Sequence, residues 1–115
     1  IGNGGGCLTT QQTGIGYPMA SLIEETYKVS MTLAKPAKIV ADGGFKKYSD
    51  VIKALALGAD AILLGRPTLY GTASGGQAGA EAVIELYRRE IDRVLGLIGC
   101  HDVADLGLDH IFSKN

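Results

Sequence analysis

Two short apolar runs, each ending in glycine beside a charged residue, constrain the fold of this chain most. The first is IVADGGF, Ile39 to Phe45, and the second is AILLGRP, Ala61 to Pro67. Because the segment between them has apolar residues at helical spacing, the sequence predicts a strand–helix–strand unit. Strands joined in this way run parallel, which places both glycine turns at the same edge of a sheet. Backbone N–H groups in such turns are suited to binding a phosphate.

Composition and charge narrow the class of protein. The 115 residues are 46% hydrophobic and 20% charged, as in a single globular domain. The formal net charge of -1 gives no reason to expect nucleic acid or an acidic membrane surface as a partner. No apolar run approaches the ~20 residues of a membrane-spanning helix. Cys7 and Cys100 are far apart and form no metal-ligand spacing, which favours a reduced, cytoplasmic setting and no metal site.

The number of predicted strands indicates part of a larger fold. The chain opens at Ile1 without methionine and supplies only about two and a half βα units, whereas a closed (β/α)8 barrel takes roughly 250 residues. We therefore expect residues 1–115 to form one partial TIM-barrel domain of the α/β class, the phosphate-binding half with about strands six to eight and their helices. Such a fragment would need the missing barrel half, or another copy in a homo-oligomer, to cover its sheet edges.

The local signals predict the following elements. They are a helix capped by Ser21, a strand over 38–41, a helix capped by Ser49 and ended by Gly58, a strand over 61–64, a flexible link over 72–79 and a long helix over 80–98. Apart from Lys38, both strands are apolar, which is typical of parallel strands buried on two faces.

Candidate binding residues follow the two strands. Gly43, Gly44 and Gly65 are expected to expose backbone N–H groups. The guanidinium of Arg66, which directly follows Gly65, is placed to bind an oxyanion. Asp42 has two interpretations, a simple turn residue or an acceptor for ligand hydroxyls.

The first ten residues, IGNGGGCLTT, also have two interpretations. They could be a frayed terminus, or a loop in which Gly4 and Gly5 approach a ligand closely and present Cys7. A thiol nucleophile flanked by glycine N–H donors, with the Thr9 hydroxyl nearby, can form a covalent adduct. A lone cysteine is more often a packing residue.

Residues 1–65 resemble the IMP dehydrogenase/GMP reductase family through GNGGGCLTT, TGIGYP, VADGG and SDVIKALALGADAILLG, in this order. The resemblance implies an oxidoreductase in which Cys7 attacks a purine nucleotide while NAD(P) exchanges hydride, and Thr9 helps to activate water or ammonia. It also implies that Asp42 holds ribose hydroxyls and that the 5′-phosphate is bound by Gly43, Gly44 and Gly65.

From Gly65 onward the chain resembles FMN-dependent α-hydroxy-acid oxidases and dehydrogenases, through LGRPTLYG and the long segment after it. This resemblance implies that Arg66 binds the phosphate of FMN. DGG and KALALGA are shared by both families. The oxidases need a histidine and an arginine in a loop that reads like NHGGR, whereas here Asn3 is followed by three glycines and Cys7.

The purine enzymes need a flap later in the chain, and no such flap follows Gly65 here. Gly5 also replaces their phosphate-binding serine.

The main expectation is a purine-nucleotide oxidoreductase with NAD(P). The alternatives are an FMN-dependent hydroxy-acid dehydrogenase fragment and a non-catalytic phosphate-binding half-barrel. The isolated chain is expected to be incomplete for turnover.

Overall fold

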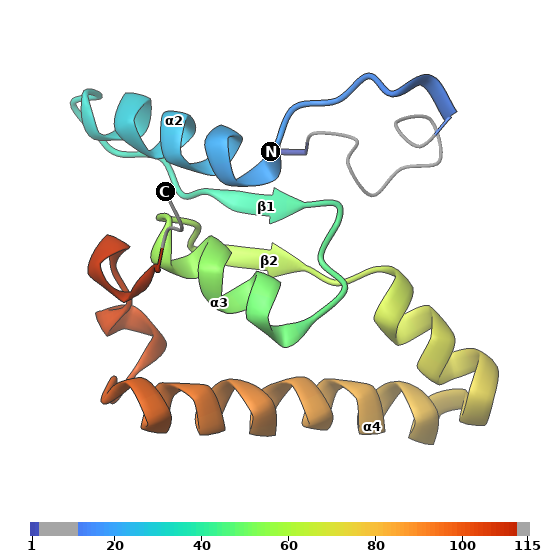
Figure 1. The fold of residues 1–115 in the computed structure, drawn as a ribbon. Helices are drawn as coiled ribbons and strands as arrows, with labels where there is room; N and C mark the ends of the chain where they lie inside the picture. The colour runs from blue at the N-terminus through green and yellow to red at the C-terminus, as the bar shows by residue number, and fades with distance from the viewer. Residues whose placement is uncertain (3–11, 113–115) are drawn as a thin grey trace.

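A computed structural model describes residues 1–2 and 12–112 and contains the predicted strand–helix–strand unit (Figure 1). The elements are α2 (Met19–Met31), β1 (Val40–Asp42), α3 (Tyr48–Ala56), β2 (Ala61–Leu63) and α4 (Arg66–Ile98), followed by the 3-10 helices η1 (Val103–Asp105) and η2 (Leu108–His110). Among these, no helix has the length and apolar character that crossing a membrane requires.

The two strands lie parallel, and their register places the two glycine turns side by side. Asp42 at the end of β1 pairs with Leu63 at the end of β2. On the opposite side of β1, Gly2 forms a parallel bridge with Asp42, and the Asp42 N–H donates to the Ile1 carbonyl at 2.8 Å. Three neighbouring segments, which end at Gly2, Asp42 and Leu63, therefore reach the same edge of the sheet. For β1 and β2 the sequence pattern predicted this arrangement.

Only one face of the sheet is buried among the described residues. Ala41 is fully buried, and the core around it comprises Ile23, Ile39, Phe45, Ala54 and Ala59, from α2, α3 and the adjoining turns. On the other face Val40 is 41% exposed and Leu63 53% exposed. The prediction of strands buried on two faces is thus wrong for residues 1–2 and 12–112, because within them α2 and α3 cover one face of the sheet.

Helix α2 begins earlier than predicted and buries a different face. It starts at Met19 directly after Pro18, whose carbonyl accepts the Leu22 N–H at 3.0 Å, so Ser21 lies inside the helix and does not cap it. The helical spacing of Leu22, Thr26, Val29 and Leu33 predicts that these residues form the apolar face of the helix. In the structure Ile23 is 1% exposed, whereas Val29 is 63% exposed. The position of the sheet, which the local sequence does not specify, decides which side of the helix is buried.

The predicted cap of α3 is also wrong, although its end was predicted correctly. Asp50 takes the capping role from Ser49, because its carboxylate accepts the N–H groups of Lys46 and Lys47 at 3.1 and 3.0 Å. The helix ends before Gly58, which has φ +106°. A Cβ atom at Gly58 would lie 2.4 Å from the ring of Tyr27, so this turn requires glycine.

Residues 72–79 do not form the predicted flexible link. Helix α4 begins at Arg66 and continues to Ile98, with non-helical backbone only at Gly75 and Gly76. The kink turns the second helical segment back beneath the sheet (Figure 1). The two segments touch through glycine, since a Cβ atom at Gly79 would lie 2.0 Å from the Gly71 carbonyl oxygen. Glycine here therefore serves the close contact of two helices.

We expect Gly79→Ala to destabilise the chain by about 1–3 kcal/mol, because the added methyl group meets backbone that cannot move independently. Gly96→Ala in the same helix is the matched control. A Cβ at Gly96 has no neighbour within 4 Å, and alanine favours helix, so that variant should be about 0.5–1 kcal/mol more stable. Urea unfolding followed by circular dichroism measures both; equal stability of the two variants would contradict the helix contact.

Asp60 ties the start of β1 to the start of β2. Its carboxylate accepts the Ile39 N–H at 2.8 Å and lies 2.7 Å from the Lys38 ammonium. The hydrogen bond from Lys38, followed by that from Ile39, lowers the pKa of Asp60 below its ordinary value of 3.8. The carboxylate is therefore more acidic in the folded chain than in the unfolded one.

A depressed folded-state pKa stabilises the fold above the unfolded pKa, and this stabilisation is lost as the pH falls through the folded value. We expect the wild type to lose stability between about pH 5 and about pH 2 more steeply than Asp60→Asn, which has no charge to lose at this position. Because the group is exposed, the difference should be small. Thermal unfolding midpoints at a series of pH values measure it, and parallel curves would exclude this role of Asp60.

Candidate functional site

The carboxyl edge of the sheet brings the predicted glycine turns together. Gly43 and Gly44 follow β1 with φ of +100° and +87°, two successive left-handed residues that only glycine adopts at low cost. Gly65 follows β2 and is the N-cap of α4. Since Asp42 and Leu63 are paired neighbours in the sheet, both turns lie at the same edge. The structure thus brings Asp42, Gly43, Gly44, Gly65 and Arg66 into one region.

The second turn is the start of a helix and not an isolated turn. Arg66 is the first residue of α4, and the Gly65 carbonyl accepts the Leu69 N–H at 3.1 Å and the Thr68 hydroxyl at 2.8 Å. Pro67 has no N–H, so Arg66 and Thr68 supply the free N–H groups of the first turn. A helix N-terminus carries partial positive charge and favours an anion.

Two cationic residues share a cavity beside this edge. The cavity has a volume of about 400 Å³ and is lined by Lys46, Arg66, Pro67, Tyr70, Val83, Leu86 and Tyr87. Lys46 belongs to the loop after Gly43 and Gly44, so each glycine turn contributes one positive charge. Sequence reasoning missed Lys46, although the two lysines that directly follow DGGF were a signal for it.

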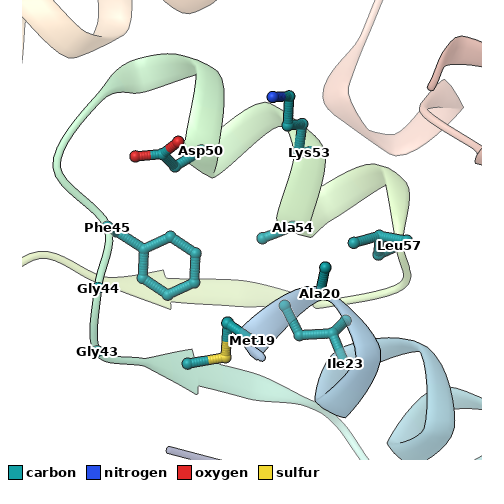
Figure 2. A pocket seen from close by; sticks show the side chains of 10 residues that line it. All are labelled: Met19, Ala20, Ile23, Gly43, Gly44, Phe45, Asp50, Lys53, Ala54 and Leu57. Carbon is teal, nitrogen blue, oxygen red and sulfur yellow. The ribbon is translucent and has the colours of Figure 1, made fainter. Parts of the chain in front are cut away.

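A second cavity lies behind the first glycine turn, between α2 and α3 (Figure 2). It has a volume of about 270 Å³, and the side chains that point into it are mainly apolar: Met19, Ile23, Phe45, Ala54 and Leu57. Asp50 and Lys53 also line it, so its two charged side chains are of opposite sign, whereas the first cavity has two positive charges. The charges therefore favour the cavity of Lys46 and Arg66 for a phosphate.

The backbone of Lys46 is held on both sides of its Cα atom. Its N–H donates to the Asp50 carboxylate at 3.1 Å, and its carbonyl accepts the Tyr87 hydroxyl at 2.6 Å. Tyr87 lies in the second segment of α4 and is buried. Burial, followed by the negative charge of Asp50, raises the pKa of Tyr87 above its ordinary value of 10.0, so the hydroxyl stays a donor at neutral pH.

Four predicted site residues lie outside the described part of the chain. They are the glycines Gly4 and Gly5 and the predicted catalytic residues Cys7 and Thr9. Asp42 is exposed at the sheet edge, where its backbone serves the pairing with Leu63 and with Ile1. Its role toward a ligand stays a prediction.

Comparisons with known proteins identify the family. The family model described as FMN-dependent dehydrogenase matches residues 18–113, which include both strands, both glycine turns and α4. The chain belongs to the FMN-dependent dehydrogenase family.

Individual relatives agree with this assignment. The chain is 46% identical to (S)-mandelate dehydrogenase of Pseudomonas putida over 84 residues, 72% of this chain and 21% of that protein. L-lactate oxidase of a Nostoc strain is 49% identical over 70 residues, 61% of this chain and 19% of that protein. The chain spans about a fifth of the length of these curated relatives.

Solved structures also resemble this fold. A soluble mutant of the membrane-associated (S)-mandelate dehydrogenase from Pseudomonas putida has a TM-score of 0.71 at 40% identity, covering 79% of this chain and 25% of that one. The flavin-binding domain of flavocytochrome b2 from baker's yeast has a TM-score of 0.72 at 36% identity, covering 78% of this chain and 24% of that one.

The predicted membership of the IMP dehydrogenase/GMP reductase family is therefore wrong, and so are the purine-nucleotide function and the NAD(P) cofactor that it implied. VADGG and the segment that begins with SDVIKALALGA lie inside the FMN-dependent match, so they do not separate the two families. The roles of Cys7 and Thr9 stay untested, but the resemblance from which they came is overturned. The match begins at residue 18 and does not include them.

The first glycine turn gives a test of its backbone conformation. We expect Gly43→Ala to lower the free energy of unfolding by about 1–2 kcal/mol, because a Cβ atom disfavours φ of +100°. Gly65→Ala is the control, since Gly65 has φ -95° and no atom within 4 Å of the added Cβ; its stability should change by less than about 0.5 kcal/mol. Denaturant unfolding of both variants measures this, and an unperturbed Gly43→Ala would exclude the left-handed turn.

Proposed function

We propose that this chain supplies the FMN-phosphate-binding part of a 2-hydroxy-acid dehydrogenase or oxidase. The observation that carries the proposal is the pair of cations, Lys46 and Arg66, on one cavity beside two glycine turns, in a chain of the FMN-dependent family. The class of substrate follows the names of the relatives, which include a mandelate dehydrogenase and a lactate oxidase.

The residues present fit the phosphate of FMN. A phosphate carries two negative charges near neutral pH and accepts several hydrogen bonds. The Lys46 ammonium and the Arg66 guanidinium would balance the charge, and Arg66 can donate two parallel hydrogen bonds. The N–H groups at the start of α4, together with those exposed at Gly43 and Gly44, would bind the remaining oxygens. Asp42, at the same edge, is suited to accept hydrogen bonds from the ribityl hydroxyls.

FMN, when bound, supplies the flavin ring that accepts two electrons from a hydroxy acid. The described part of this chain contributes binding and orientation, because its charges and N–H groups gather at the phosphate edge. At the positions that resemble the NHGGR loop, Gly4 and Cys7 stand in place of histidine and arginine. The proposal therefore concerns binding of the cofactor by this chain and does not assign it turnover.

Within the barrel we place β1 and β2 at about strands seven and eight, with Ile1 and Gly2 at the end of strand six. Phosphate sites of such barrels commonly lie in the loops after strands seven and eight. The exposed face that carries Val40 and Leu63 would then point to the barrel interior, where the remaining strands cover it. The apolar character of both strands supports this placement.

The proposal is tested by comparing FMN with riboflavin, which lacks only the 5′-phosphate. We expect the wild-type chain to bind FMN more tightly than riboflavin. Arg66→Ala should weaken FMN binding by about 10- to 150-fold, since a charged hydrogen bond contributes about 1.5–3 kcal/mol. Riboflavin binding should be unchanged. Quenching of flavin fluorescence measures both dissociation constants.

Arg93→Ala is the matched control for Arg66→Ala, because Arg93 is an exposed arginine near the other end of α4. Its loss should leave the affinity for FMN unchanged. Lys46→Ala should behave like Arg66→Ala. A wild-type chain that does not discriminate FMN from riboflavin would refute the proposed phosphate site.

A further inference from the structure

The Tyr87 hydroxyl joins two parts of the chain that are 41 residues apart. It donates to the Lys46 carbonyl at 2.6 Å, and Tyr87 is 9% exposed. The residue lies on the second helical segment of α4, the one that begins after the kink at Gly75 and Gly76. Tyr87 therefore connects the long helix to the loop that follows the first glycine turn.

We propose that Tyr87 is a positioning residue for the phosphate site: its hydrogen bond to the Lys46 carbonyl fixes the loop so that Lys46 faces the same cavity as Arg66. This inference rests on the proposed binding of the FMN phosphate and adds the residue that aligns the two cations. Tyr87 itself also lines that cavity.

The geometry of the loop explains why the hydrogen bond from Tyr87 to the Lys46 carbonyl matters. Gly43 and Gly44 both adopt left-handed conformations and have no side chains with which to anchor the segment. On the N–H side, the Asp50 carboxylate holds Lys46 and Lys47 to the start of α3. The Lys46 carbonyl, by contrast, is bound by Tyr87 of α4. Because the N–H and the carbonyl of Lys46 are both bound, its backbone is held on both sides of the Cα atom, and less backbone entropy is lost when an anion binds.

Helix α4 contributes both Arg66 and Tyr87 to the cavity. Arg66 is the first residue of α4, and Tyr87 lies in its second segment, so the kink at Gly75 and Gly76 brings one helix to the site twice. The contact between Gly71 and Gly79 holds the two segments close together. The distance between the Lys46 loop and Arg66 thus depends on Tyr87 and on this helix contact.

The test is Tyr87→Phe, which keeps the buried ring and removes only the hydroxyl. Dissociation constants for FMN and riboflavin are measured by fluorescence quenching with the full chain. We expect about a threefold to tenfold loss of FMN affinity, in proportion to one neutral hydrogen bond, and no change for riboflavin. Tyr27→Phe is the control, because Tyr27 packs against Gly58 at the opposite edge of the sheet. It should leave both constants unchanged.

The outcomes separate this inference from the proposed function. If the wild type fails to prefer FMN over riboflavin, the phosphate site itself is refuted, and the role of Tyr87 with it. If the wild type prefers FMN and Tyr87→Phe keeps the full preference, only the role of Tyr87 is overturned. An equal loss for both flavins assigns Tyr87 a merely structural role and also overturns it.

A measurement on the wild type keeps the inference testable should Tyr87→Phe fail to fold. The Lys47 amide directly follows the carbonyl that Tyr87 binds. Titration of ¹⁵N-labelled chain with FMN should shift this amide resonance, whereas riboflavin should not. An amide that stays unshifted at saturating FMN contradicts the coupling of this loop to the phosphate site.

Discussion

The parallel pairing of β1 with β2 is the interaction on which the candidate site depends. Asp42 lies beside Leu63, so the residues that follow each strand must emerge at one edge. A shift of the register would separate Gly43 and Gly44 from Gly65 and place Arg66 away from the Lys46 loop. The register is held at its opposite end by Asp60, whose carboxylate accepts the Ile39 N–H. A surface carboxylate at the beginning of the strands thus helps to align the cations at their ends.

Packing of the helices converts this edge into a cavity with a defined charge. Helix α3 is capped by Asp50, which holds the N–H groups of Lys46 and Lys47, and α4 contributes both Arg66 and Tyr87. The acidic cap lies on the side of the apolar cavity between α2 and α3. Lys53 lines that cavity with Asp50, whereas Lys46 and Arg66 line the other one without an acidic residue, so the two cavities differ in the ligands that they favour.

The strands and their glycine turns could be predicted because each is a local pattern: an apolar run followed by DGG or by GRP. The parallel arrangement followed from the helix between them. The caps of α2 and α3 could not be predicted in this way, because Pro18 and Asp50 compete with Ser21 and Ser49 and only the tertiary structure decides between them. The helical structure within 72–79 was missed because TASGGQAG is rich in glycine and serine, whereas Gly75 and Gly76 form only a kink and Gly79 serves the contact with Gly71. Lys46 was missed because its role arises from a cavity shared with residues 20 to 41 positions away.

A predicted phosphate site does not by itself identify the family or the ligand. Glycine turns after two parallel strands fit a nucleotide, a flavin or another phosphate equally well, since all present the same oxygens. The initial assignment gave weight to Cys7 and the glycines around it, which lie before the region that matches the family. The match to the FMN-dependent family continues past the second strand through Arg66, Pro67 and the long helix that carries Tyr87. The segment that lines the cavity of the two cations is therefore part of the matched region. In the proposed site the turns would bind the phosphate, and the helix behind them would set how the two cations meet it.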